Sequence, residues 1–325
     1  MARPLAVLTG ATGFLGGWLT RALHDAGYDL RVLVRRDPGP DAWGEARPAV
    51  VIGALDDDGA LEALLQGASL VIHAAGLIKA RNRRAFFEVN EGGSRRMAAA
   101  MVRCAPTARF VHISSIVARH PELSSYAASK RAGEAAVSAM LPAERLTIVR
   151  PPAIYGPGDL ETLSLFRAAR WAPVLPLPGS SHARIALIHV ADAAAQIAAI
   201  AAQSANGSTY TLSDARPEGY RWREIMQAAS AAVGRSPRLI PAPAALILAL
   251  GALGGGFGGL AGSAAILTMG KARELLHPDW AVSSQEIAPG LPRCRFDIVD
   301  GFADTVAWAR AAGRLCTRLR RSPAA

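Results

Sequence analysis

The hydrophobic positions of this chain fall into short apolar runs separated by longer stretches with helical periodicity. Runs of four or five mostly apolar residues are typical of buried parallel strands. They cover residues 5–8, 30–34, 49–52, 70–74, 109–113 and 146–150, with helical patterns between them near 15–26, 59–66, 86–103 and 124–140. This alternation predicts an α/β fold of Rossmann type, in which helices cover both faces of a doubly wound parallel sheet.

A glycine-rich turn joins the first predicted strand to the first predicted helix. It reads Thr9-Gly10-Ala11-Thr12-Gly13-Phe14-Leu15-Gly16. Glycines at this spacing allow a tight turn, close approach of the backbone to a pyrophosphate, and close packing of helix on strand. The N-terminus of the following helix presents unpaired N–H groups to the phosphates. The turn therefore predicts a dinucleotide-binding site.

The strand–helix rhythm ends after Arg150, where segments rich in proline and glycine begin. Two later runs, Ile185–Ile188 and Thr209–Leu212, are predicted short strands that can return to the sheet. We assign residues 1–155, with returning segments at about 186–215, to a dinucleotide-binding Rossmann domain. Residues 156–185 and 216–325 are assigned to a smaller, interleaved C-terminal substrate-binding region.

One segment of that region carries no charge over 32 positions, from Leu239 to Gly270. Its length exceeds the roughly 20 apolar residues that span a bilayer. Two prolines, Pro241 and Pro243, and seven glycines between 251 and 262 would interrupt a spanning helix. We expect residues 239–270 to form buried lid or pocket helices, with peripheral membrane contact as the alternative.

Length, cysteine content and charge narrow the class of protein. A chain of 325 residues, 51% hydrophobic, is long enough for a substantial core. Its cysteines, Cys104, Cys294 and Cys316, are scattered, which argues against a disulfide scaffold and against a metal site. Together with an N-terminus that leads directly into a strand, this predicts a cytoplasmic protein, with the inner membrane surface as the alternative location.

The net charge of +10 comes mainly from dispersed arginines, with one dense run in the tail at Arg310, Arg314, Arg318, Arg320 and Arg321. No nucleic-acid motif accompanies them, so we expect no nucleic-acid partner. Attraction of phosphorylated cofactors or of an anionic membrane surface explains the charge as well.

A tyrosine and a lysine four residues apart suggest acid–base chemistry. Tyr126 and Lys130 share one face of the helix predicted at 124–140. Only three of the 36 basic residues are lysines, so the ammonium at this position suggests a chemical requirement. An ammonium near a phenol stabilises the phenolate, and we expect it to lower the pKa of Tyr126 from about 10 toward neutrality.

Further motifs follow in a fixed order. They are Val71-Ile72-His73-Ala74-Ala75-Gly76, Asn90, Val111-His112-Ile113-Ser114-Ser115, Tyr126–Lys130, the run from Arg150 through Tyr155-Gly156-Pro157-Gly158-Asp159, and His189-Val190-Ala191-Asp192. With the glycine turn they resemble the extended short-chain dehydrogenase/reductase superfamily, the NAD-dependent epimerase/dehydratase group, over most of residues 5–215. Two C-terminal segments, Leu276–Trp280 and Gly301–Trp308, look most like dihydroflavonol reductases and 3β-hydroxysteroid dehydrogenases.

The resemblance implies roles for four residues. Tyr126 is the proton donor to a carbonyl oxygen during reduction, and Lys130 tunes it and binds the nicotinamide ribose. Ser115 stabilises the reacting oxygen. The neighbouring Ser114 is set aside only because the family alignment favours Ser115. Asn90 supports the backbone and a water of the active site.

The end of the second predicted strand bears on the choice of cofactor. NAD-binding enzymes carry an acid there for the ribose 2′-hydroxyl, whereas this chain has Arg35 and Arg36, which suit a 2′-phosphate. We expect NADP(H) to be preferred and NAD(H) to remain usable. The family usually has Gly-Asp-Leu after strand three; this chain has Gly53-Ala54-Leu55, which leaves Leu55 and Asp56 as partial substitutes near the adenine.

The cofactor site implied by the resemblance extends along the carboxyl ends of the strands. Its members are Gly10, Thr12, Gly13, Phe14, Leu15, Gly16, Arg35, Arg36, Leu55, Asp56, Ala74, Ala75, Gly76, Tyr126, Lys130, Pro151, Ala153 and Ile154.

Three functions are compatible with these residues. The first is an NADPH-dependent carbonyl reductase or alcohol dehydrogenase for a moderately large apolar small-molecule substrate. The second is a sugar-nucleotide epimerase or dehydratase that retains NAD, and the third is a non-catalytic NADP-binding sensor or assembly protein. As in relatives, we expect a homodimer formed through the helices at 86–103 and 124–140.

Overall fold

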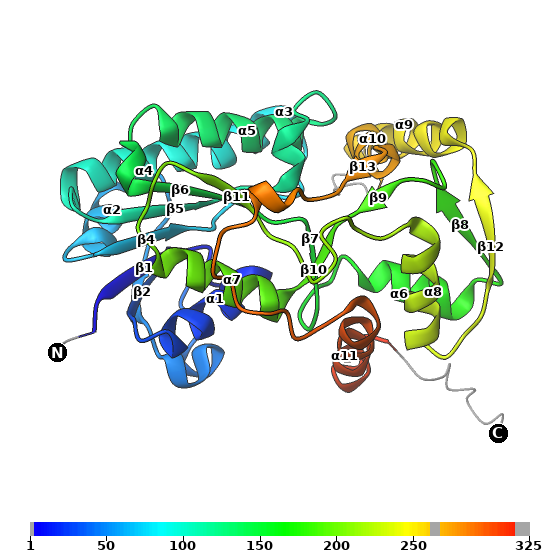
Figure 1. Cartoon of the computed structure of the whole chain (residues 1–325). Helices are drawn as coiled ribbons and strands as arrows, with labels where there is room; N and C mark the ends of the chain where they lie inside the picture. Colours follow the sequence, from blue (N-terminus) through cyan, green and yellow to red (C-terminus); the bar gives the residue numbers. More distant parts are fainter. Residues whose placement is uncertain (1–2, 261–266, 316–325) are drawn as a thin grey trace, which may run out of the picture.

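The computed structural model describes residues 3–260 and 267–315 and places a seven-stranded parallel sheet at its centre (Figure 1). Its strands are β1 (Leu5–Thr9), β2 (Asp29–Val34), β3 (Ala49–Ile52), β4 (Leu70–His73), β5 (Arg109–Ile113), β6 (Leu146–Arg150) and β11 (Thr209–Thr211). The spatial order is β3-β2-β1-β4-β5-β6-β11, and every pair is parallel. The order reverses at β1, as in dinucleotide-binding folds. The predicted Rossmann fold is confirmed.

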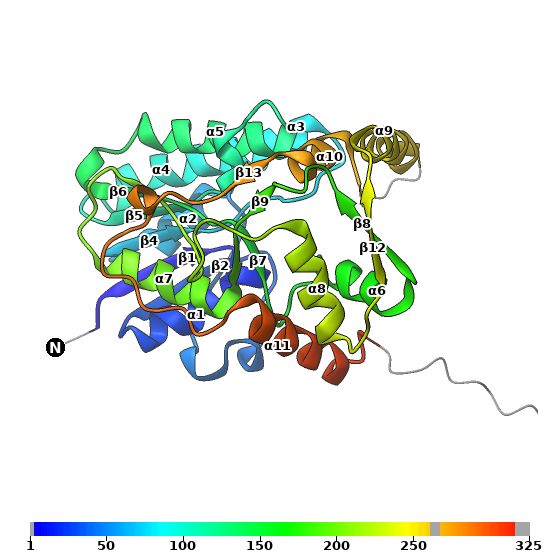
Figure 2. The same cartoon turned by 45° about the vertical axis from the view of Figure 1, so that its right-hand side comes forward.

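Helices cover both faces of this sheet (Figures 1 and 2). One face carries α1 (Phe14–Asp25) and α7 (Val190–Ala202), which bury Leu19, Leu23 and Ile197 against strand residues such as Ile72. The other carries α2 (Asp58–Leu65), α4 (Gly93–Cys104) and α5 (Ser125–Ser138), whose apolar sides include Leu61, Met97, Met101 and Val137. Both faces of the sheet are thus removed from water, which explains the continuously apolar strands.

The helix predicted at 86–103 is interrupted. The chain forms α3 (Arg83–Phe87), a π-helical turn η2 (Glu88–Gly92) and then α4. Asn82 caps the first of these by accepting a hydrogen bond from the Ala85 N–H. A π-helical turn widens the helix locally and is frequent at functional sites. Here it contains Asn90.

The C-terminal region has its own apolar core. Its members include Tyr155, Phe166, Ile185, Ile225 and Phe302. The strands are β7 (Ala153–Tyr155), β8 (Val174–Pro178), β9 (Arg184–Ile185), β10 (Leu187–His189), β12 (Arg238–Ala242) and β13 (Asp279–Trp280), and the helices are α6 (Leu163–Trp171), α8 (Trp222–Ala232), α9 (Ala244–Leu260), α10 (Met269–Leu276) and α11 (Ile298–Ala311). Short 3-10 turns η1 (Pro40–Ala46), η3 (Ile116–Arg119), η4 (Ala143–Arg145) and η5 (Ser284–Glu286) complete the described elements.

Only one of the two predicted returning strands joins the central sheet. β11 pairs with β6, with Tyr210 opposite Val149. The segment at 185–188 instead contributes to β9 and β10, and β10 pairs with β7 in a separate two-stranded sheet. β11 occupies the edge beside β6, and β10 pairs instead with β7, the strand that follows β6 in the chain.

The uncharged segment 239–270 forms the end of β12, then α9 and the start of α10. Ile247 and Gly251 of α9 are buried, whereas Leu246, Leu250 and Leu253 are exposed. The expectation of buried lid or pocket helices is therefore wrong for one side of α9. No helix among residues 3–260 and 267–315 combines the length and apolarity needed to cross a bilayer. Residues 261–266 of this segment, together with Cys316, Arg318, Arg320 and Arg321 of the tail, lie outside the described residues.

Two histidines are buried side by side in the sheet, His73 on β4 and His112 on β5. Their rings stack with centroids 5.7 Å apart. Burial, reinforced by the positive charge of Lys130, lowers the pKa of His73 from 6.5 to about 3 and the pKa of His112 well below 6.5. Neither ring nitrogen of His112 has a hydrogen-bond partner in the described part of the chain. Both imidazoles are therefore neutral in the folded protein.

The neutral histidines predict a loss of stability in mild acid. Below about pH 6.5 the unfolded chain binds protons that the folded sheet excludes, so the free energy of unfolding falls as pH falls. We expect His112→Leu to make this fall shallower between about pH 6.5 and pH 5, as measured by urea unfolding. The exposed His182→Leu is the matched control and should keep the wild-type slope. Equal slopes in both variants would contradict the assignment.

Candidate active site

The glycine turn after β1 lies against the end of β4. Gly10 has φ +78°, and a Cβ there would lie 2.7 Å from the backbone carbon of Ala74 and the nitrogen of Ala75. A Cβ on Gly16 would lie 2.0 Å from the carbonyl oxygen of Gly10. Only glycine fits at both positions, because backbone occupies the space of the missing side chain. The turn thus brings the N-terminus of α1 directly to the carboxyl ends of β1 and β4.

The first turn of α1 is open toward solvent. Gly13 is the N-cap in extended conformation, and no side chain caps this end of the helix. Thr12 and Gly13 are exposed, whereas Phe14 and Leu15 are partly buried. Uncapped N–H groups with the positive end of the helix dipole form an anion site of the kind that holds a pyrophosphate. These residues fit the phosphates of a dinucleotide.

A second glycine-rich loop, 155–159, closes over the first. A Cβ on Gly158 would lie 3.3 Å from the ring of Phe14. The indole nitrogen of Trp18 donates a hydrogen bond to the carbonyl oxygen of Pro157 at 3.2 Å. The start of the C-terminal region therefore rests on the helix that faces the phosphates.

Two of the predicted catalytic side chains, Ser115 and Tyr126, meet in the structure. Tyr126 is the second residue of α5, and Ser115 lies at the end of β5, where it precedes η3. Burial raises the pKa of Tyr126 to about 12, while a hydrogen bond with the Ser115 side chain acts in the opposite direction and the charge of Glu274 adds to the rise. The expected lowering of this pKa is wrong, because burial outweighs it. The phenol therefore holds its proton at neutral pH.

The two adjacent serines, Ser114 and Ser115, have different partners in the structure. The Ser114 hydroxyl is buried and donates a hydrogen bond to Glu134 at 2.5 Å. Glu134 also accepts two hydrogen bonds from the Arg150 guanidinium, at 2.8 and 2.6 Å. Ser114 is thus engaged inside the protein, whereas Ser115 contacts Tyr126. This geometry favours Ser115 on grounds that the sequence did not contain.

Lys130 lies one helical turn beyond Tyr126 and is buried. Its ammonium donates a hydrogen bond to the carbonyl oxygen of Ile113 at 2.7 Å. Burial lowers the pKa of Lys130 to about 8, and the carboxylate of Glu134 limits the fall. A Cβ on Gly76 would lie 3.7 Å from this ammonium, so the loop after β4 passes directly beside it.

Asn90 joins the loop after β4 to α5. Its Oδ1 accepts a hydrogen bond from the Leu77 N–H at 2.7 Å, and its Nδ2 donates to the Leu77 carbonyl at 3.0 Å and to Ser129 Oγ at 2.8 Å. All polar atoms of this buried amide are used within the protein. Its position in the π-helical turn aims the side chain at both partners. Asn90 thereby supports the backbone of the site.

Arg35 and Arg36 follow β2 at the same edge of the sheet. Both are exposed, and neither has an ion-pair partner among residues 3–260 and 267–315. Asp37 instead accepts a hydrogen bond from the Gly39 N–H at 2.9 Å and is engaged in its own turn. Two free guanidinium groups without a competing acid are a donor set that fits a ribose 2′-phosphate.

The two residues expected near the adenine, Leu55 and Asp56, lie in different surroundings. Leu55 is partly buried, and its side chain occupies the space beside Gly93, where a Cβ would lie 2.8 Å from Leu55 Cδ1. Arg96 of α4 donates a hydrogen bond to the Leu55 carbonyl at 3.0 Å. Asp56 is exposed. Leu55 is thus held against α4, whereas the Asp56 side chain faces solvent.

The remaining predicted cofactor residues lie on the carboxyl side of β6. The carbonyl of Pro151 accepts a hydrogen bond from the Ile116 N–H at 2.9 Å, which ties it to the segment that follows Ser115. Pro151 is buried, Ile154 is partly buried and Ala153 is exposed at the start of β7. These residues border the predicted nicotinamide end of the site.

Two buried glutamates, Glu134 and Glu274, support the site. Neither was predicted as a site residue from the sequence. Glu134 lies four residues after Lys130 on the same helix face, which was a usable signal. Glu274 on α10 accepts a hydrogen bond from Ser124, the N-cap of α5, and its carbonyl accepts one from the indole nitrogen of Trp280 at 3.0 Å. Nothing in the sequence links residue 274 to residue 124. Only the fold brings them together.

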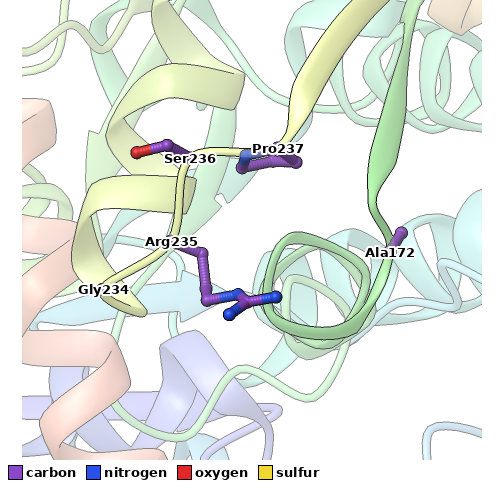
Figure 3. Close-up of a pocket in the computed structure, with 5 residues that line it drawn as sticks. All are labelled: Ala172, Gly234, Arg235, Ser236 and Pro237. Atoms are coloured by element: carbon purple, nitrogen blue, oxygen red, sulfur yellow. The ribbon is translucent and has the colours of Figure 1, made fainter.

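A surface hollow of about 340 Å³ lies elsewhere in the C-terminal region (Figure 3). It is lined by Ala172, Gly234, Arg235, Ser236 and Pro237, and Arg235 reaches across it toward α6. It contains none of the predicted site residues. No group of three or more histidine, cysteine, aspartate or glutamate side chains placed to hold a metal ion occurs in the described parts of the chain.

Known proteins resemble this chain in sequence and in fold. Ceramide reductase of Caulobacter vibrioides is 50% identical over 314 residues, which cover 97% of this chain and 97% of that protein. The crystal structure of gox2253 has the same fold, with a TM-score of 0.75 and 20% identity over 96% of this chain and 99% of that one. So does UDP-glucose 4-epimerase of Thermus thermophilus in complex with NAD, with a TM-score of 0.70 and 20% identity over 95% and 99% of the two chains.

The match therefore extends from sequence to fold. Residues 6–213 match the NAD dependent epimerase/dehydratase family, and they contain the glycine turn, Asn90, Ser115, Tyr126 and Lys130. The fold binds nucleotide cofactors in this family, and the C. vibrioides relative is a reductase. The chain belongs to the NAD dependent epimerase/dehydratase family and is an oxidoreductase of the extended short-chain dehydrogenase/reductase type.

Proposed function

We propose that this protein is an NADPH-dependent reductase that converts a ketone of a ceramide-type lipid into an alcohol. The observation that carries the proposal is the Ser115–Tyr126 contact beside the buried ammonium of Lys130. The substrate class rests on the 50% identity with ceramide reductase over nearly the whole of both chains.

The chain's own residues supply the proton and the orientation. With a ketone oxygen next to Tyr126, the raised pKa keeps a proton on the phenol, ready to be donated as the oxygen becomes negative. Ser115 donates a hydrogen bond to the same oxygen. The Lys130 ammonium, held by the Ile113 carbonyl, stabilises the phenolate that remains. A bound nicotinamide cofactor would supply the hydride.

Several features support NADPH rather than NADH. Arg35 and Arg36 are exposed at the end of β2, and Asp37 is engaged with Gly39. An acid in that position would repel a 2′-phosphate, whereas a guanidinium forms charge-assisted hydrogen bonds with it. Gly10, Gly13 and Gly16, with the open end of α1, would hold the pyrophosphate.

The assignment of residues 156–185 and 216–325 to the substrate is part of the same proposal. Their apolar core around Phe166 and Phe302 is separate from the two cores that flank the sheet. We also retain a homodimer through α4 and α5 as a proposal. Light scattering coupled to size-exclusion chromatography tests it.

The test of the proposed function is NADPH consumption with a panel of ketones. The panel contains a ceramide in which a hydroxyl has been oxidised to a ketone, a sterol ketone, a flavanonol and UDP-glucose. Turnover of the ceramide ketone supports the proposal. Turnover of UDP-glucose by protein that retains NAD would instead assign the site to an epimerase.

Removal of the phenolic hydroxyl should abolish proton donation. We expect Tyr126→Phe to lower kcat by about 10²–10⁴-fold with little change in cofactor affinity, because a positioned acid contributes about this much. Steady-state kinetics and a fluorescence titration with NADPH measure the two effects. The control is Tyr210→Phe, whose hydroxyl accepts a hydrogen bond from Asn206 at the surface. Full activity in Tyr126→Phe would exclude Tyr126 as the acid.

The pKa of Lys130 predicts the alkaline limb of the pH profile. The ammonium is charged below about pH 8 and neutral above it, so kcat/KM for reduction should fall by about tenfold per pH unit beyond that point. In Lys130→Arg the charge persists, and the remaining activity should lack this limb. Lys79→Arg, on an exposed lysine paired with Glu161, should keep it. A limb unchanged in Lys130→Arg would assign it to another group.

Cofactor preference tests the two arginines. We expect the double variant Arg35→Ser/Arg36→Ser to raise the KM for NADPH by about tenfold or more, because a charge-assisted hydrogen bond contributes about 1.5–3 kcal/mol. The KM for NADH should change little. Arg310→Ser/Arg314→Ser removes the same charge from the exposed end of α11 and serves as the control. A parallel rise for both cofactors would argue against recognition of a 2′-phosphate.

A further inference from the structure

One face of α9 is apolar and uncovered. Leu246, Leu250 and Leu253 recur at spacings of four and three residues and are 53%, 49% and 58% exposed. They therefore lie on the same side of the helix. The opposite side is occupied by α10: a Cβ on Gly251 would lie 2.9 Å from the Cβ of Ala272. A helix that is hydrophobic on all sides is normally buried on all sides, so the leucine face lacks a partner within the described chain.

The adjoining two-stranded sheet is also apolar on its outer face. β8 and β12 pair in register, with Val174 opposite Arg238 and Pro176 opposite Ile240. Val174, Pro176 and Ile240 are all exposed, as is Trp171 at the end of α6. Figures 1 and 2 both show α9 following β12 at the end of the molecule away from β1–β3. Half of the large hydrophobic residues that are exposed in the described part of the chain therefore lie on these elements, namely Trp171, Val174, Ile240, Leu246, Leu250 and Leu253.

The charged residues in the segment that forms this surface have one sign. No acidic residue occurs between Glu224 and Glu274, while the same stretch contains Arg235, Arg238, Lys271 and Arg273. All four cations are exposed, and Glu274 is buried. An apolar face whose own segment of the chain carries only cations matches the hydrocarbon and anionic headgroups of a bilayer surface. A second copy placed on this face would bring like charges together.

Helices α9 and α10 connect this surface to Tyr126 through direct contacts. α10 packs on the N-terminus of α5, where a Cβ on Gly270 would lie 2.7 Å from the Cβ of Ser124. Ser124 donates a hydrogen bond to Glu274, and Lys271 forms an ion pair with the same carboxylate at 3.2 Å. Tyr126 follows Ser124 by two residues. A membrane surface bound to α9 is therefore separated from Tyr126 on α5 by one helix, α10.

We propose that the leucine face of α9, with the outer face of β8 and β12, docks on the anionic surface of a lipid bilayer. The helix lies in the plane of the interface, with its leucines among the acyl chains and Lys271 and Arg273 at the headgroups. The proposal of docking rests only on the exposure of the apolar residues and on the charge of the segment. Its use, delivery of a lipid ketone from the bilayer to Tyr126, rests on the proposed function.

Flotation with vesicles tests the docking without turnover. We use the full chain and compare vesicles of phosphatidylcholine with vesicles that also contain phosphatidylglycerol. We expect flotation with the anionic vesicles and its loss at high salt, because the cations act through a screened field. The variant Leu246→Gln/Leu250→Gln should bind at least about tenfold more weakly, because each leucine contributes buried apolar area. The control Met140→Gln/Val299→Gln changes exposed residues elsewhere and should bind as the wild type does.

The outcomes separate docking from catalysis. NADPH oxidation with a short-chain, water-soluble ketone should be equal in wild type and the leucine variant, whereas oxidation with vesicle-borne ketone should fall with binding. Equal flotation of the leucine variant and the wild type, or no flotation at all, overturns the docking. Equal binding to neutral and anionic vesicles overturns the role of the cations.

A wild-type dimer that the leucine substitutions convert to monomer assigns the face to a second copy. Flotation without turnover of any ketone leaves the docking intact and removes the proposed function.

Discussion

The buried pair between Glu134 and Arg150 holds the site in place. It joins helix α5 to β6 with two hydrogen bonds, and the same carboxylate accepts a hydrogen bond from Ser114, which directly follows β5. Both side chains are largely withdrawn from water, so loss of Glu134 would leave the Arg150 guanidinium without the carboxylate that accepts its hydrogen bonds, at a cost of about 3–5 kcal/mol. This pair holds α5 beside β5 and β6, and with it the position of Tyr126 relative to Ser115, which follows β5.

Other contacts fix α5 from further directions. Asn90 attaches its Ser129 to the loop after β4, and Gly133 allows the π-helical turn to approach, since a Cβ there would lie 2.6 Å from the Asn90 carbonyl oxygen. Glu274 attaches its N-cap to α10. The helix is thus held at both ends and along one side. A proton donor must keep its distance from the reacting oxygen, and such clamping supplies that precision.

The electrostatics of the site follow from burial more than from pairing. Removal from water lowers the pKa of Lys130 and raises that of Tyr126, and the lysine charge adds to the lowering of the pKa values of His73 and His112. The two imidazoles and the phenol stay neutral, so Lys130 is the group of these four that carries a charge at neutral pH. A local Tyr–Lys spacing could not indicate this balance, because desolvation depends on what covers the residues.

The sequence by itself determined the parallel sheet, the glycine turn and the order of the chemical motifs, because these depend on local periodicity and on backbone freedom at Gly10 and Gly16. It also placed Tyr126 and Lys130 on one helix face. Only the tertiary structure engaged Ser114 with Glu134, recruited Glu274 from 150 residues away and moved the segment at 185–188 out of the central sheet. It also left one side of α9 uncovered by the described residues. Such outcomes depend on which elements compete for the same edge or cover the same face, and that competition exists only once the whole chain is folded.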